Sequence, residues 1–166
     1  IYLDSPMAIN ASKIYRAHLD DQGLSDAECR STCAVATYTR TVDASKALDR
    51  DRHPTVIISA SGMATGGRVL HHLKAFASDA RNAILFAGYQ ASGTRGAALV
   101  GGADQIKMFG EYFPVRAEVR NLSRLSAHAD RDGLMRWLRG FKSPPGRIFI
   151  THGEDAAADA LRLTIK

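Results

Sequence analysis

The sequence has few cysteines and no long apolar run. Without a run of about eighteen apolar residues or a basic-then-apolar leader, neither a membrane span nor secretion is expected, and a cytoplasmic protein is the default. The two cysteines, Cys29 and Cys33, lie four apart in a stretch with a helical pattern, so they should not form an ordinary structural disulfide. No second cysteine pair or nearby histidine completes a zinc set, so core-facing or half-exposed thiols are expected.

The chain also lacks an initiator methionine, opens directly on a strand pattern and stops at Lys166 inside an amphipathic pattern. We therefore expect it to be a piece of a longer polypeptide. Its 166 residues, 45% hydrophobic, suffice for one ordinary α/β core or for one domain and part of a second. Lys and Arg number 22 against 17 Asp and Glu, a net charge of +5 that is compatible with a polyanionic partner.

One pattern recurs along the chain: a short β-branched apolar run, a loop rich in Gly and Ser, then a helical period. Such alternation predicts an α/β fold with a mainly parallel sheet and helices on both faces. The loops at the carboxyl ends of the strands should then gather on one edge, where ligands bind. The five repeats cover residues 1–19, 55–77, 83–99, 115–141 and 147–166.

The first glycine-rich loop, SGMATGGR at residues 61–68, follows a strand pattern and precedes a helix pattern. Its glycines, Gly62, Gly66 and Gly67, would let backbone N–H groups approach an anion, with Arg68 as a charged clamp. A tight turn without a ligand explains the spacing equally well.

The second glycine-rich loop, GYQASGTRG at residues 88–96, offers Tyr89 as a stacking face and Arg95 as a cation. These residue types favour contact with nucleic acid. A flexible connection whose tyrosine packs on the core is the alternative.

His128, in the stretch SAHAD, precedes a predicted helix for which Asp130 is a natural N-cap. A lone histidine before a cap is usually a solvated loop residue, but beside a second loop histidine it becomes a candidate general acid or phosphate ligand. The buried face of the helix is predicted from 3- and 4-residue spacing to contain Leu134, Trp137, Leu138 and Phe141.

His152 has the local context closest to that of a metal ligand. It follows the predicted strand RIFIT, is freed by Gly153, and has Glu154 and Asp155 close by. Those two acids also suit a helix N-terminus, which favours negative charge. The other histidines are weaker candidates, because His71 and His72 should point to different helix faces and His18 and His53 have no evident acidic or Cys/His company.

Five segments, IYLDSPMA, SGMATGGR, FAGYQASGTRG, LSAHAD and THGE, occur in an order and at separations that closely resemble the β-CASP branch of the metallo-β-lactamase superfamily. Its members are zinc-dependent nucleases of RNA and DNA. The segments are most like those of the RNA-processing members, including bacterial and archaeal ribonucleases and the cleavage-and-polyadenylation endonuclease subunit. The likeness spans essentially the whole chain.

The resemblance implies that residues 1–116 are the later part of a β-CASP domain and residues 117–166 a return segment of an incomplete metallo-β-lactamase domain, with the active site in the cleft between the two domains. A composition shift near residue 116 agrees with this division. His128 falls on the family's motif B histidine, which contacts the scissile phosphate region. His152 falls on its motif C histidine, a ligand of a two-zinc site.

By the same resemblance, the substrate is single-stranded RNA, with DNA left open. Ser126 and the two glycine-rich loops, with Arg68 and Arg95, would hold its backbone. The family's main zinc motif, His-x-His-x-Asp-His, is missing from these residues, and motif A would precede Ile1. The chain alone is therefore expected to be inactive and to bind zinc weakly at most, and a homo-oligomer would be one way to cover exposed apolar surface.

Two other functions remain open. The first is a non-catalytic β-CASP-like protein that binds RNA or serves as a scaffold. The second is an unrelated doubly wound domain that binds a nucleotide at residues 61–68, which leaves SAHAD and THGE unexplained.

Overall fold

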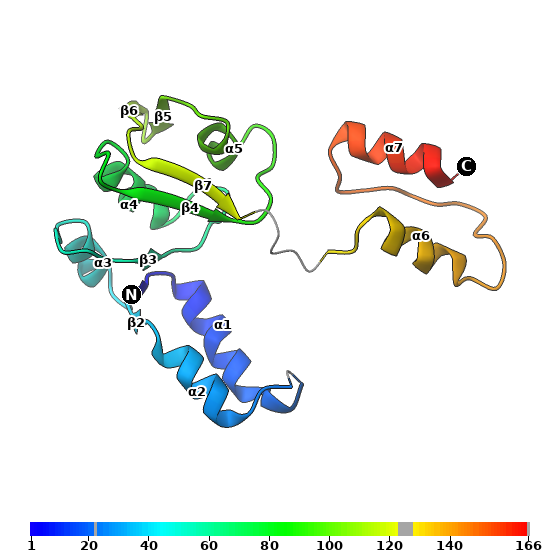
Figure 1. Ribbon diagram of the computed structural model, residues 1–166, viewed down its shortest axis with the longest axis horizontal. Helices are drawn as coiled ribbons and strands as arrows, with labels where there is room; N and C mark the ends of the chain where they lie inside the picture. Colours follow the sequence, from blue (N-terminus) through cyan, green and yellow to red (C-terminus); the bar gives the residue numbers. More distant parts are fainter. Residues whose placement is uncertain (22, 123–127, 166) are drawn as a thin grey trace. The chain divides into compact units, whose positions relative to one another are not determined.

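The computed structural model describes residues 1–21, 23–122 and 128–165. The chain divides into two compact units, Ile1–Leu122 and Ser123–Lys166, each described here by itself (Figure 1). The assignment of residues 1–116 and 117–166 to two family domains stays a prediction.

The first unit contains most of the regular structure, in short strands that alternate with helices. Its elements are β1 (Tyr2–Leu3), α1 (Pro6–Ala17), a 3-10 turn η1 (Leu19–Asp21), α2 (Asp26–Ala34), β2 (Thr37–Tyr38), α3 (Val42–Leu48), β3 (Ile57–Ile58), α4 (Val69–Phe76), β4 (Ala83–Ala87), α5 (Arg95–Val100), β5 (Gln105–Met108), β6 (Glu111–Pro114) and β7 (Glu118–Leu122).

The strands form parallel pairs, as the βα pattern predicts. β1 is the centre of a three-stranded parallel sheet in the order β2-β1-β3, with Tyr2 opposite both Thr37 and Ile57. β4 and β7 form a second parallel pair (Figure 1). The predicted mixed α/β fold with parallel sheets is thus confirmed, although the strands belong to separate short sheets.

An antiparallel hairpin of β5 and β6 was not predicted. The two strands are joined by Phe109 and Gly110, whose φ angles are 51° and 88°. Positive φ at both central residues suits the right-handed twist of a hairpin, but Asn-Gly or Asp-Gly is its usual signal. Because Phe109 stands in that place, the sequence pattern does not predict the turn.

Local side-chain caps explain where many of the helices begin. Ser5 accepts from the Ala8 amide at the start of α1, and Ser25 and Glu28 form a reciprocal capping box at α2. Asp130 accepts from the Gly133 amide at 2.7 Å at the start of the helix that follows it, which confirms the predicted cap.

The core of the first unit joins α4, β4, α5 and the β5–β6 hairpin. Apolar side chains from all four segments contact one another there, together with Ala64 of the first glycine-rich loop. The buried members are Ala64, Leu70, Leu73, Phe86, Leu99, Ile106 and Met108.

The cysteines behave as the sequence indicates. Both are free thiols on α2, with Cys29 buried and Cys33 half-buried. Burial, together with the neighbouring Cys33 thiol, raises the pKa of Cys29. The buried thiol of Cys29 thus packs in the interior as a neutral group.

The second unit contains two described helices, α6 (Arg131–Arg139) and α7 (Asp155–Ile165). Two predictions are wrong here. Residues 147–151 form no strand, because no described residue pairs with their backbone, and Phe149 is 80% exposed. The apolar face of α6 has the predicted period, but none of its residues is buried, since the described residues supply nothing that covers it.

Among the described residues, no helix has the length and apolar character needed to cross a bilayer.

Leucine-to-alanine substitutions test this division into a packed core and an exposed second unit. Leu99→Ala, at a side chain that is 1% exposed, should lower the free energy of unfolding by about 2–5 kcal/mol through lost burial and a residual cavity. Leu163→Ala, at a side chain that is 58% exposed, should change it by about 0.5 kcal/mol or less. Urea denaturation followed by circular dichroism measures both, and equal losses would contradict the assigned core.

Candidate functional site

A buried carboxylate stands at the carboxyl end of the central strand β1. Asp4 is 0% exposed and its amide donates to the Ile58 carbonyl, which continues the sheet for one residue. Ser45, from α3, donates its hydroxyl to one carboxylate oxygen at 2.5 Å. A buried carboxylate is costly unless it is paired, so the groups around it are held firmly.

Arg68 and His72 complete the shell of Asp4. Arg68, just before α4, donates from Nη1 to Oδ1 at 2.5 Å. His72, one turn further along, lies with Nε2 2.7 Å from Oδ2, while its Nδ1 is 2.6 Å from Oδ1 of Asp49. Each ring nitrogen of His72 thus faces a carboxylate oxygen, a group that only accepts hydrogen bonds when ionised.

The balance of these interactions favours an ionised Asp4. Burial raises its pKa, but the hydrogen bonds from Ser45, Arg68 and His72 outweigh burial and hold the pKa below the ordinary value of 3.8. With no exposed surface, this carboxylate cannot touch a substrate. Its role is to fix the start of α4 and the loop that leads into it.

That loop satisfies its own amides. Ser61, at φ 69°, turns its hydroxyl so that it accepts from the backbone N–H groups of Thr65 (3.1 Å) and Gly66 (3.2 Å). Gly67 has φ 78°, a conformation open to glycine. The serine oxygen thus already accepts hydrogen bonds from amides in the loop that was predicted to bind an anion. Anion binding by Gly62, Gly66 and Gly67 stays a prediction.

The second glycine-rich loop is bound to the first. Gln90 donates to the Gly62 carbonyl (2.9 Å), and the Gly96 amide donates to the Met63 carbonyl (2.9 Å). Arg95 donates from Nη1 to the Thr65 carbonyl (3.2 Å). The structure therefore brings together the two loops that the sequence identifies separately.

The charged and aromatic side chains of these loops have different surroundings. Arg68 and Arg95 point their guanidinium groups at internal carbonyls, Arg68 at Thr39 and Arg95 at Lys107. Tyr89 is 64% exposed, so the alternative in which it packs on the core is wrong. Direct contacts of Tyr89, Arg68 and Arg95 with RNA stay predictions.

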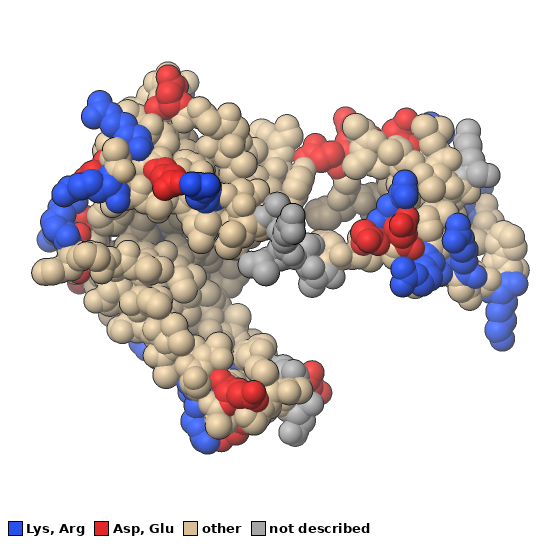
Figure 2. All heavy atoms as spheres, in the orientation of Figure 1, with Lys and Arg blue, Asp and Glu red and all other residues tan. Residues whose placement is uncertain are grey.

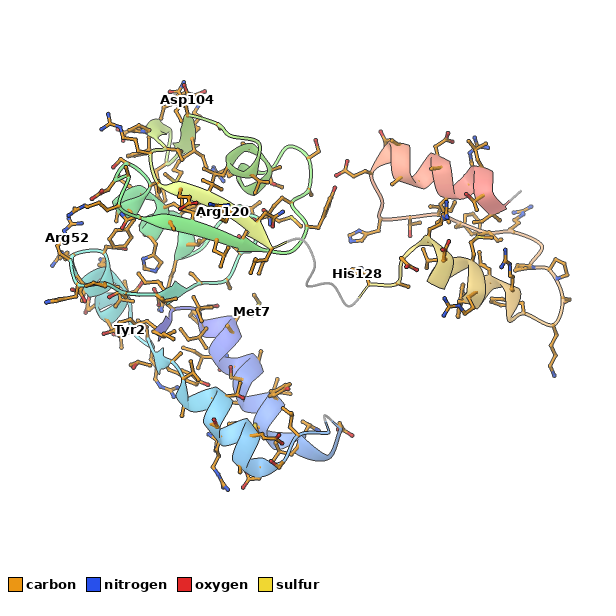
Figure 3. The ribbon with its side chains drawn as sticks, viewed as in Figure 1. Tyr2, Met7, Arg52, Asp104, Arg120 and His128 are labelled. Carbon is orange, nitrogen blue, oxygen red and sulfur yellow. The ribbon has the colours of Figure 1, made fainter. Side chains whose placement is uncertain are left out.

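The candidate catalytic residue His128 and the candidate zinc ligand His152 belong to the second unit. His128 is exposed and lies just before α6 (Figure 3). His152 is exposed and has a positive φ of 65°. Gly153, which was expected to free the turn, does not have a positive φ. Histidine tolerates this left-handed conformation better than most residues, and such outliers concentrate at functional sites. Ser126 lies outside the described residues.

Metal ligands do not converge within the part of the chain that the structure describes. No three His, Cys, Asp or Glu side chains come close enough there to hold an ion. Asp155 lies in the first turn of α7, where its charge favours the helix N-terminus. A complete zinc site therefore does not fit the described residues alone, and His152 as a zinc ligand stays a prediction.

Sequence reasoning missed the network around Asp4. His72 is 68 residues from Asp4 and 23 from Asp49, separations that no local pattern reveals. The view that His18 and His53 lack acidic company is also wrong, because His53 Nδ1 is 2.7 Å from Asp51. His18 Nδ1 is 3.4 Å from Asp21. Those acids stand two and three positions away, so the sequence contained this signal.

The family model of the Beta-Casp domain matches residues 1–99. The chain belongs to the β-CASP family of the metallo-β-lactamase superfamily. A second model, for the Zn-dependent metallo-hydrolase RNA specificity domain, matches residues 112–166.

Several curated proteins are similar to this β-CASP chain. Ribonuclease TTHA0252 of Thermus thermophilus is 39% identical over 172 residues, which cover 97% of this chain and 38% of that protein. The transcription termination factor FttA of Methanosarcina mazei is 37% identical over 120 residues, 69% of this chain and 19% of that protein. An RNase J-like protein of Methanocaldococcus jannaschii is 36% identical over 122 residues, 74% of this chain and 28% of that protein. The chain thus spans well under half the length of these relatives.

Removing the charge of Asp4 should unfold or loosen the first unit. Asp4→Asn leaves the Arg68 guanidinium without its buried carboxylate and should cost about 3–5 kcal/mol in the free energy of unfolding, measured by urea denaturation. The matched control is Asp26→Asn, which breaks the exposed 2.5 Å pair with Arg30 and should cost at most about 1 kcal/mol. Similar costs for the two variants would contradict the network's role.

The lowered pKa of Asp4 also predicts acid sensitivity. A carboxylate whose pKa is lower in the folded state stabilises the fold above its unfolded pKa, and that stability is lost as the pH falls through the folded pKa. Ser45→Ala removes one interaction that lowers the pKa. The variant should therefore lose less unfolding free energy than the wild type between about pH 5 and pH 2.

Ser12→Ala is the control for this measurement, because the Ser12 hydroxyl donates only to the Ala8 carbonyl on α1. Its pH dependence should match that of the wild type. If Ser45→Ala also matches the wild type over this pH range, then Asp4 does not drive the acid loss.

Proposed function

We propose that this chain is part of a zinc-dependent ribonuclease that hydrolyses RNA phosphodiester bonds in RNA processing or decay in the cytoplasm. The observation that carries the proposal is the match of 97% of the chain to a protein named ribonuclease. A match to a model of an RNA specificity domain supports the choice of RNA over DNA. Taken alone, the 166 residues are expected to be inactive.

In this proposal His152 is one zinc ligand, and the other ligands come from outside these 166 residues. Its exposure and its position ahead of α7 leave the imidazole accessible to such partners. When bound, a zinc pair supplies a hydroxide at neutral pH and neutralises charge on the attacked phosphate.

His128 is proposed to donate a hydrogen bond or a proton to the phosphate or to the leaving oxygen. It is exposed and lies two residues before the Asp130 cap, so its backbone is anchored to the start of α6. A positioned acid of this kind typically contributes about 10²- to 10⁴-fold in rate. The exposed ring of Tyr89 is proposed to stack on a base, on a loop that Gln90 and Arg95 hold in place.

The second candidate is a non-catalytic member of the family that binds RNA or serves as a scaffold. The absence of a three-ligand cluster among the described residues is compatible with this function. Zinc content and cleavage by the complete polypeptide separate the two candidates.

Three histidine variants of the complete polypeptide test the proposal, with zinc per polypeptide and cleavage of labelled single-stranded RNA as readouts. His152→Asn suits the left-handed backbone and should lose zinc and activity together. His128→Ala should keep zinc and lose about 10²- to 10⁴-fold in rate. His53→Asn, at a histidine whose pair with Asp51 is local, should change neither.

A wild-type polypeptide that binds RNA, contains no zinc and cleaves nothing would establish the scaffold instead. If His152→Asn binds as much zinc per polypeptide as the wild type, His152 is not a zinc ligand.

A further inference from the structure

α6 has two faces of opposite character. At 3.6 residues per turn, Leu134, Trp137, Leu138 and Phe141 share one side. Arg136 and Arg139 lie on the opposite side, and Arg131 lies at the boundary between the two sides. The apolar side is the side that would pack on further protein, because Trp137 is 66% exposed and rests edge-on against Phe141. The arginine side is therefore the one that remains open to solvent.

The arginine side forms one wall of a shallow hollow. Thr164, near the end of α7, also lines the hollow, so both helices of the second unit border it. Figure 2 shows Lys and Arg side chains gathered over the part of this unit that carries α6. The residues that line the hollow are Arg131, Asp132, Met135, Arg136, Arg139 and Thr164.

The cations of the hollow are not neutralised. Arg131 pairs with Asp132 at 3.1 Å, but both side chains are mostly exposed, so the pair is weak and readily exchanged. Within the described part of the chain, Arg136 and Arg139 form no ion pair. Three arginines against one aspartate leave the hollow cationic, whereas Arg162 on α7 is paired locally with Asp159.

We propose that this hollow binds phosphate groups of the backbone of single-stranded RNA, a site separate from the two candidate catalytic histidines. The inference rests on the proposed function, since it assumes an RNA substrate. The arginines span two helical turns, a rise of about 12 Å, which is longer than one phosphate group and suits a polymer. A guanidinium group offers a fork of donors that matches phosphate oxygens.

Recognition at this site should be independent of base sequence. The Thr164 hydroxyl donates to the Ala160 carbonyl at 2.8 Å, so the arginines supply the hydrogen bonds to phosphate. Phosphate contacts of this kind fix the position and register of a strand and add affinity that depends on salt.

The salt dependence of RNA binding tests the inference. Binding of labelled single-stranded RNAs of two sequences to the complete polypeptide is measured across a salt series for the wild type and for Arg136→Gln/Arg139→Gln. Gln is as good a helix former as Arg, so α6 should be kept. The slope of log K against log salt should fall by about 0.7 for each phosphate contact removed, equally for both RNAs.

Two further double variants complete the test. Arg30→Gln/Arg162→Gln removes the same charge from exposed, locally paired arginines and should leave the slope unchanged. Arg136→Lys/Arg139→Lys keeps the charge and should keep most of the slope.

The inference is overturned if the wild type binds and cleaves RNA while Arg136→Gln/Arg139→Gln has the wild-type slope, or if the control pair lowers the slope equally. A wild type that binds no RNA would overturn the proposed function and this inference together. The two failures are thus distinguishable.

Discussion

The arrangement of the first unit depends on the compensation of one buried negative charge. The carboxylate of Asp4 lies at the end of the central strand of its sheet, fully enclosed, with partners from α3 and from the start of α4. A buried ion pair adds little stability over an apolar contact, but its geometry is demanding, because a displaced partner leaves a charge unpaired. Asp4 thus determines where α4 begins relative to β1.

The positions of the glycine-rich loops depend on this buried carboxylate. Arg68, the last residue of the first loop, donates a hydrogen bond to the buried carboxylate. The second loop is hydrogen-bonded to the first through Gln90, Arg95 and the amide of Gly96. Arg95 extends the connection to the β5–β6 hairpin by donating to the Lys107 carbonyl at 2.6 Å. The two loops therefore form one hydrogen-bonded surface, on which Tyr89 remains exposed.

Features with a local cause were predictable from the sequence, and features that need distant partners were not. The βα alternation, the Asp130 cap and the helical thiols are encoded within a few residues of where they occur. The prediction of a strand before His152 is wrong because a strand needs a hydrogen-bonded neighbouring strand, and the described residues provide none. The sequence identified both glycine-rich loops as candidate sites, but not that they bind each other.

The position of β1 in its sheet has a consequence for the order of folding. It is the first strand of this chain to be synthesised, yet it is the central one, so both of its neighbours appear later. The hydrogen-bond partners of the Asp4 carboxylate are synthesised later still, since Arg68 and His72 follow it by 64 and 68 residues. Contacts of such separation slow folding and expose apolar segments in the interval. During synthesis, therefore, the sheet around β1 and the charge network of Asp4 can be completed only after α4 has been made.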